Sequence, residues 1–258
     1  MFMKQMKFLL VALMAVVMSV SVTSCMNGDD NNIVQRGIFV KNDYTSFVAA
    51  DGIKIVPSSG MNTLLTGTYY YIACQYDMSQ FTENSTSLSV TLLGEPICID
   101  PKSGENPSSS ARSATNPLYA LSSELKSGMI YFDKNTLIMP IVFWYKSDSD
   151  SEKVNAELAK HSFYLSYDTE AIKADDTKLV LTINHVVTES GEEKVKRETY
   201  TSIYKAYTLT SALDAFFSKT KKVPEYIVLQ AKTNSSEDKL KENDEKYSTL
   251  ELEYPFDN

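Results

Sequence analysis

Short stretches that alternate between apolar and polar residues follow one another along most of the chain. The clearest occupy residues 87–93, 161–167, 179–185 and 247–254. Because successive side chains of a β-strand point to opposite faces, this period of two predicts strands with one buried face. Other strongly β-prone stretches occupy residues 37–40, 45–49, 53–56, 68–77, 97–99, 129–132, 137–145, 194–207 and 225–231. The pattern predicts an all-β chain.

One stretch near the C-terminus has helical spacing instead. Its apolar residues recur every three or four positions, at Leu209, Leu213, Phe216 and Phe217. This spacing predicts one short helix over residues 208–218, with Ser211 and Asp214 as a capping box at its start. A further turn of helix is expected near residues 154–158.

A polar segment divides the strands into two groups. Residues 101–117 are rich in proline, serine and asparagine, a composition that buries little apolar surface and predicts a linker. The five or six short strands of residues 37–100 indicate a small barrel or a meander sheet. Residues 118–258 hold the longer alternating strands and form the second predicted domain.

The N-terminus predicts export and lipid anchoring. Residues 1–24 combine Lys4 and Lys7 with an apolar run shorter than the roughly 20 residues that span a bilayer, as a signal peptide does. Small residues then precede Cys25, which resembles a bacterial lipobox, so we expect Cys25 to be lipidated and to attach the chain to a membrane. An ordinary cleaved signal and a buried apolar helix are the alternatives. Residues 25–36 are predicted to be the tether.

The charge narrows the partners. The chain has 25 basic and 33 acidic residues, which gives a formal net charge of −8. Cleavage of the signal also removes Lys4 and Lys7, so the mature chain is more acidic still. So acidic a surface repels a phosphate backbone, and nucleic acid is not an expected partner.

Two cysteines remain if Cys25 carries lipid. An exporting compartment permits a disulfide between Cys74 and Cys98, and two buried free thiols are the alternative. The sequence has no CxxC motif and no histidine close to either cysteine, so it gives little support to a thiol enzyme.

The two histidines are the other candidate reactive residues. His161 and His185 fall on predicted neighbouring strands and could approach each other. A zinc site needs three or four protein ligands, and no further ligand has telling spacing, so structural hydrogen-bonded histidines are the interpretation we favour. No G-x-S-x-G elbow supports a hydrolase. We predict no catalytic site, no metal site and no cofactor.

An acidic segment has two interpretations. Asp148, Asp150 and Glu152 place carboxylates at every second position, as a calcium loop does. The glycine and the distal glutamate of an EF-hand are missing, so a solvated loop is expected.

A cluster of tyrosines is the candidate binding surface. Tyr69, Tyr70, Tyr71 and Tyr76 fall on one predicted strand and cannot all point inward. An outward ring could stack on a sugar or anchor a protein partner. Packing between the two domains is the alternative, and we favour it.

Three segments of the chain resemble the NigD-like lipoproteins of Bacteroidota. They are Leu65–Tyr71, which follows the pattern of a strand after a glycine turn, Lys160–Leu165, which begins with a histidine-led strand, and Leu179–His185. The resemblance implies a small N-terminal OB-like barrel over residues 37–100 and an antiparallel β-sandwich over residues 118–258. Asn184 departs from the family, which often has a basic residue before the second histidine.

These observations together predict a non-enzymatic lipoprotein of the outer membrane, exposed at the cell surface, that binds a protein or a glycan or serves as a structural part of the envelope. The family's association with bacteriocin loci adds an immunity-type protector as an alternative. An OB-like barrel can bind oligosaccharides, which adds a glycan-binding accessory protein.

Overall fold

The computed structural model describes residues 32–59, 64–80, 82, 85–99, 101–103, 113–189, 195–235 and 245–256, with the backbone alone at 101–103. The predicted signal of residues 1–24, Cys25 and the tether up to residue 31 lie outside this range. The chain divides into two compact units. The first runs up to Pro101 and includes Ile130–Asp133, and the second holds Lys102–Met129 and the residues from Lys134 onward.

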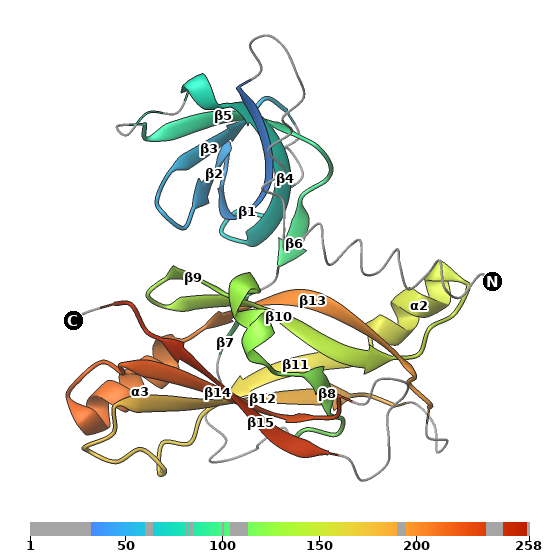
Figure 1. Cartoon of the computed structure of the whole chain (residues 1–258), viewed down its shortest axis with the longest axis vertical. Helices are drawn as coiled ribbons and strands as arrows, with labels where there is room; N and C mark the ends of the chain where they lie inside the picture. Colours follow the sequence, from blue (N-terminus) through green and yellow to red (C-terminus); the bar gives the residue numbers. More distant parts are fainter. Residues whose placement is uncertain are drawn as a thin grey trace. The chain divides into compact units, whose positions relative to one another are not determined.

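The first unit is a closed barrel of five strands (Figure 1). Its strands are β1 (Ile33–Asp43), β2 (Ser46–Ala49), β3 (Lys54–Pro57), β4 (Tyr69–Asp77) and β5 (Ser87–Leu92). They follow the order β1-β2-β3-β5-β4, and pairing of β4 with β1 closes the ring. All neighbours are antiparallel except β3 and β5. The predicted OB-like barrel is confirmed.

The barrel closes because β1 is long enough to pair twice. Its first nine residues pair with β4 and its last four with β2. Gly37 allows the ring of Tyr71 to lie against the β1 backbone, since a Cβ on Gly37 would collide with the Tyr71 hydroxyl. Gly52 adopts φ +82° in the predicted turn between β2 and β3. Apolar side chains fill the interior, among them Val40, Phe47, Ile55, Ile72, Leu88 and Val90.

Short elements complete the first unit. Strand β6 (Ile97–Ile99) pairs with β4, and the 3-10 turn η1 (Met78–Gln80) follows β4. Strand β1 begins at Ile33, inside the predicted tether, because Ile33 to Arg36 continue the ladder with β4.

The second unit is a β-sandwich (Figure 1). One layer contains β11 (His161–Ser166), β12 (Lys178–Val187), β14 (Tyr226–Thr233) and β15 (Lys246–Glu253). The other contains β8 (Leu118–Ala120), β10 (Thr136–Tyr145), β13 (Thr199–Thr208) and β7 (Pro101–Ser103). Strand β9 (Ile130–Asp133), which is counted with the first unit, precedes β10 in the chain. The layers join where Thr233 of β14 pairs with Leu118 of β8. Between them, Phe143 of β10 packs on Phe163 of β11, with ring centroids 4.8 Å apart.

The prediction of a sandwich is confirmed, but its strands are not all antiparallel. Strands β12 and β14 are parallel, as are β14 and β8. A parallel pair needs a crossover connection, and the chain makes it by passing from β12 through β13 in the other layer and helix α3 (Thr210–Thr220) before β14. The linker prediction for residues 101–117 also needs correction, because β7 pairs with β13 there, with Pro101 as its first residue.

The helices differ in detail from the prediction. Helix α3 is confirmed, but it begins at Thr210 after an N-cap at Leu209 with no side-chain cap, so the predicted capping box at Ser211 is wrong. A second helix, α2 (Ser151–Leu158), lies where a turn was expected, and η2 (Ser123–Gly128) is a 3-10 segment. None of the helices in the described ranges has the length and apolarity that crossing a membrane requires.

Candidate functional site

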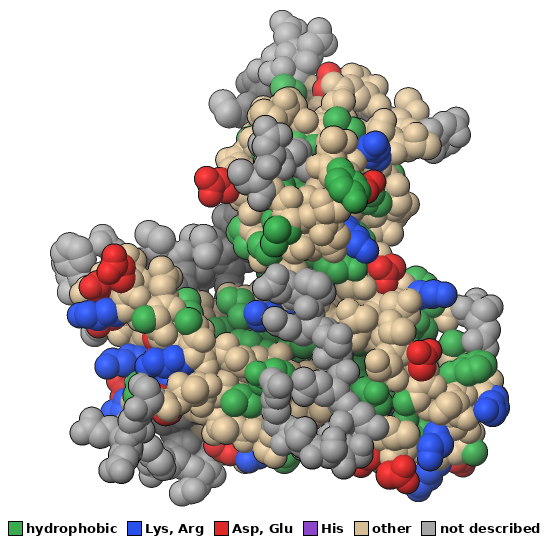
Figure 2. Space-filling view, turned by 180° about the vertical axis from the view of Figure 1, so that it is seen from behind, with side chains coloured by type: hydrophobic (Ala, Val, Ile, Leu, Met, Phe, Trp, Pro, Cys, Tyr) green, Lys and Arg blue, Asp and Glu red, His purple; other side chains and the backbone are tan. Residues whose placement is uncertain are grey.

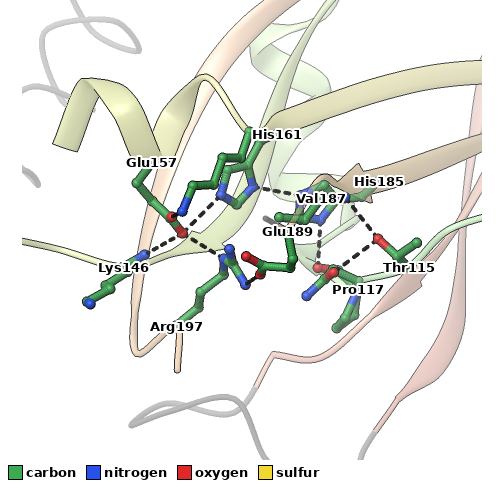
Figure 3. A network of polar contacts seen from close by, with 11 residues as sticks. Thr115, Pro117, Lys146, Glu157, His161, His185, Val187, Glu189 and Arg197 are labelled. Atoms are coloured by element: carbon green, nitrogen blue, oxygen red, sulfur yellow. Dashed lines mark hydrogen bonds and ion pairs between the residues drawn. The ribbon is translucent and has the colours of Figure 1, made fainter. Parts of the chain in front are cut away.

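The second unit contains a cluster of ionisable side chains away from solvent (Figure 3). We call Glu157, His161, His185 and Arg197 the buried polar cluster. Their exposed fractions are 5%, 9%, 1% and 4%. Glu157 comes from the last turn of α2, His161 opens β11 four residues later, His185 is on β12, and Arg197 precedes β13. Three regions that are distant in sequence therefore meet at one place.

The two histidines are directly hydrogen-bonded, as their predicted neighbouring strands allowed. His161 Nδ1 lies 2.8 Å from His185 Nε2. The strand pairing places Phe163 opposite His185 and His161 opposite Val187, so both rings point to the same face of the sheet. His185 Nδ1 lies 3.1 Å from the carbonyl oxygen of Pro117.

Three contacts along this series each need a hydrogen, and two neutral imidazoles supply only two. A carbonyl oxygen only accepts, so His185 Nδ1 carries a hydrogen and donates it to Pro117. A neutral His185 then has a lone pair on Nε2, and His161 Nδ1 must donate to it. With both rings neutral, His161 Nε2 has a lone pair toward Glu157 Oε1, and this 3.4 Å contact, the longest of the series, becomes a hydrogen bond only when His161 is protonated.

Glu157 is the centre of the charged half of the cluster. Its Oε1 accepts hydrogen bonds from Arg197 Nε at 2.8 Å and from the Lys146 backbone N–H at 3.4 Å. Its Oε2 lies 3.1 Å from Lys160 Nζ. Burial acts to raise the pKa of Glu157, but the hydrogen bond from Lys160 and the positive charge of Arg197 outweigh it, so this pKa is lowered. Glu157 is therefore ionised at neutral pH.

Arg197 joins two carboxylates. Its Nη1 lies 2.7 Å from Glu189 Oε1, while Nε binds Glu157. The Glu189 side chain is 30% exposed and the Arg197 side chain 3%. The guanidinium is thus neutralised on both sides, which a buried cation requires.

Burial keeps the histidines neutral. It lowers the pKa of His185 to about 3, partly against the hydrogen bond to Pro117, and it lowers the pKa of His161 despite the nearby Glu157. Aromatic rings cover both imidazoles: Phe163 stacks on His185 with centroids 4.7 Å apart, and Phe143 lies 4.9 Å from His161. Figure 2 shows no histidine on the face it presents.

The geometry limits the chemistry of this cluster. Two zinc-bound nitrogens in a tetrahedral site stand about 3.4 Å apart, whereas these two stand 2.8 Å apart with a hydrogen between them. Across the described ranges, no group of three or more His, Cys, Asp or Glu side chains is placed to hold a metal ion. In a serine-type triad a hydroxyl or thiol would donate to the lone-pair nitrogen of the base, and His161 occupies that position at His185 Nε2.

The acidic segment before α2 has a structural role. Asp150 is the N-cap of the helix, and its Oδ1 accepts a hydrogen bond from Glu152 N at 2.9 Å. Asp148 Oδ1 accepts in turn from Asp150 N at 3.0 Å. The carboxylates that a calcium loop would use as ligands therefore cap the start of helix α2.

The possible disulfide between Cys74 and Cys98 is not formed. Cys98 pairs with Tyr70 across the β4–β6 ladder, and Cys74 lies four residues further along β4. At about 3.3 Å per residue this separation exceeds the Cα distance of about 7 Å that a disulfide tolerates. The alternative of two buried thiols holds for Cys74 alone, because Cys98 is exposed.

The predicted tyrosine surface reduces to one ring. Tyr69, Tyr70 and Tyr76 are 5%, 2% and 8% exposed, whereas Tyr71 is half-buried. Tyr70 points into the barrel, where its hydroxyl accepts a hydrogen bond from Leu65 N at 2.9 Å. Tyr69 packs edge-on against Phe132 of the same unit. Of these four residues, only Tyr71 is not buried, and its ring packs against Gly37 and Phe39 of β1.

Sequence reasoning missed Glu157 and Arg197. Glu157 could have been found from its spacing, because a carboxylate four residues before His161 at a helix end reaches that imidazole. Arg197 is 40 residues from Glu157 and lies in an irregular segment, so no local pattern marks it.

Comparisons with known proteins agree with the fold. No protein-family model matches the chain, and no curated protein is found to be similar. A solved structure of a candidate lipoprotein from Bacteroides fragilis is 28% identical, with a TM-score of 0.71, and the match covers 85% of this chain and 97% of that one. A protein of unknown function from Bacteroides vulgatus is 11% identical, with a TM-score of 0.52 and coverage of 87% and 92%, a likeness in fold alone. The first likeness extends to the sequence as well as the fold, over most of both chains.

Proposed function

We propose that this protein is a non-enzymatic lipoprotein of the bacterial outer membrane, anchored through Cys25 and exposed at the cell surface as a binding module. Membership of the NigD-like lipoproteins is part of the proposal. An OB-like barrel followed by a β-sandwich, the order that this family has, supports it.

One observation carries the non-enzymatic part. The histidines form a hydrogen-bond series that ends on a backbone carbonyl, and both imidazoles are buried under aromatic rings. A general base needs a free nitrogen within reach of a substrate proton, and a nucleophile needs such a base beside it. Here both ring nitrogens of His185 are engaged, and His161 Nε2 is buried against the Glu157 carboxylate, where a substrate proton does not reach it.

The same cluster supports a structural role for the sandwich. It ties α2, β11, β12 and the segment before β13 together through contacts of 2.7 to 3.4 Å. Buried ionic groups of this kind fix one arrangement of the elements, because any other arrangement would leave a charge unpaired. The sandwich is then a rigid support.

The distribution of charge gives no support for nucleic acid as a partner. Figure 2 shows lysine and arginine side chains interspersed with aspartate and glutamate on the face it presents. The formal net charge of −8 disfavours a strongly anionic partner, because like charges repel.

Protease shaving of intact cells tests the anchoring and the orientation. We expect protease to release peptides from both units while a periplasmic control protein stays protected, because the proposal places the whole mature chain outside. Mass spectrometry of the mature protein should find the N-terminal cysteine, Cys25, acylated. The variant Cys25→Ser is the matched control and should leave the membrane fraction.

Two results would contradict this proposal, and they are distinct. An unlipidated Cys25 in the mature protein would refute the anchor. Peptides that appear only after the cells are lysed would refute surface exposure and place the chain on the periplasmic side.

A further inference from the structure

The barrel has a groove of about 380 Å³ beside β4 and β5, which we call the β4–β5 groove. It lies where these two strands separate. Their ladder holds only two residue pairs, Cys74 with Leu92 and Gln75 with Thr91. Beyond Gln75, strand β4 continues its pairing with β1 up to Asp77, while β5 pairs with β3 on its other side.

The separation exposes a row of small polar side chains on β5. Residues of this strand alternate, so that Leu88 and Val90 point into the barrel while Ser87, Ser89 and Thr91 are exposed. Ser89 and Thr91 line the groove, whereas Ser87 on the same face does not. Ser58, which lies next to β5, also lines the groove, and its backbone N–H donates a hydrogen bond of 3.0 Å to Val90 O.

Amide and apolar groups complete the walls. Gln75 and Gln80 contribute amides, which both donate and accept hydrogen bonds. Val56 and Ile33, 37% and 53% exposed, contribute apolar surface next to them. Hydroxyls and amides beside exposed apolar side chains match a ligand whose surface alternates hydroxyl groups with C–H faces.

The charge of the lining restricts the ligand further. Asp77 is its one ionisable group apart from the buried Tyr76, and no lysine or arginine is among the lining residues. Asp77 Oδ1 is already engaged by Ser79 N at 2.8 Å. A phosphate, sulfate or carboxylate ligand would have no cation to pair with, so the groove selects against anions.

We propose that the β4–β5 groove binds a neutral oligosaccharide. This inference rests on the proposed function, because it names the ligand class of the binding module. The volume of the β4–β5 groove falls in the range of about 300–1,000 Å³ typical of small-ligand sites. Short side chains on paired strands lose little conformational freedom on binding, so their hydrogen bonds serve affinity efficiently.

A binding screen with the full-length mature lipoprotein in detergent tests the proposal. The probes are neutral oligosaccharides of three to six hexose units, including glucans and mannans, with sulfated and sialylated oligosaccharides as charged counterparts. We expect at least one neutral probe to bind and the charged counterparts to bind no more tightly. Isothermal titration calorimetry then gives the affinity of each variant.

The variants use the alternation of β5. Ser89→Tyr fills the groove and should weaken binding by about tenfold or more, and Thr91→Val removes one hydroxyl at nearly constant shape and should weaken it by several-fold. Ser87→Tyr is the matched control, since it adds the same ring to the same exposed face outside the groove, and it should leave affinity unchanged.

Three results would overturn the inference: no neutral probe binds, binding is indifferent to Ser89→Tyr, or an extended peptide from a random library binds in a Ser89→Tyr-sensitive way while no oligosaccharide does. The last would make the groove a peptide site. These failures leave Cys25 acylation and protease shaving unaffected, so they can be told apart from failure of the proposed function.

Discussion

The substitution Arg197→Met lowers the free energy of unfolding by about 3–5 kcal/mol, the cost of breaking a buried ion pair by removing one partner. Arg197 Nε donates to Glu157 at 2.8 Å and Nη1 lies 2.7 Å from Glu189, and its side chain is 3% exposed. Without the guanidinium, Glu157 stays buried with Lys160 as its remaining cation. Urea unfolding followed by circular dichroism measures the loss.

An exposed ion pair provides the matched control. Lys178 pairs with Glu251, with both side chains at least 43% exposed. Lys178→Met should therefore cost less than about 1 kcal/mol. The double variant Glu157→Gln with Arg197→Met should regain part of the loss, because it removes the unpaired carboxylate. Equal effects of Arg197→Met and Lys178→Met would show that the cluster does not hold the sandwich together.

Acid weakens the fold through His185. Burial lowers its pKa to about 3 in the folded protein, against an ordinary value of 6.5. Between these values the unfolded chain binds a proton that the folded chain does not. The stability from the neutral ring is therefore fully present above about pH 6.5 and is lost as pH falls toward about 3, at about 1.4 kcal/mol per pH unit. His161, whose pKa burial also lowers, acts in the same direction.

The variant His185→Asn isolates this contribution. The asparagine amide stands where Nδ1 stands and can still donate to Pro117, but it does not titrate. Between about pH 7.5 and about pH 4.5, the wild type should lose about 2–3 kcal/mol more stability than the variant. Urea titrations at a series of pH values measure the difference. Parallel curves for the two proteins would assign the acid sensitivity to other groups.

The strands and the barrel were predictable because their signals are local. Alternation at residues 161–167 and 179–185 indicated two half-buried strands, and β11 and β12 lie there with Phe163, Leu165, Leu179 and Leu181 inward. The aromatic-rich stretch at residues 68–77 became β4. Period-two patterning fixes which face is buried, whatever the neighbour is.

Pairing between distant segments was not predictable in the same way. Parallel pairing of β12 with β14 depends on the path of the chain through the other layer, and propensity does not encode that path. The alternating pattern predicted that His161 and His185 lie on neighbouring strands. It gave no sign that Arg197 joins the same cluster, because Arg197 lies outside the alternating segments. The disulfide failed because cysteine count carries no information on separation along paired strands.

Nuclear magnetic resonance of the imidazole nitrogens tests the central claim, that the ionisable cluster is sealed and structural. The chain has two histidines, so the spectrum of a tag-free protein contains only these rings. Burial keeps both rings neutral, the hydrogen bonds then predict Nδ1–H tautomers, and each ring should titrate below its ordinary pKa of 6.5. A ring that titrates near 6.5, or that carries its proton on Nε2, would contradict the account and leave a histidine free to act as a base.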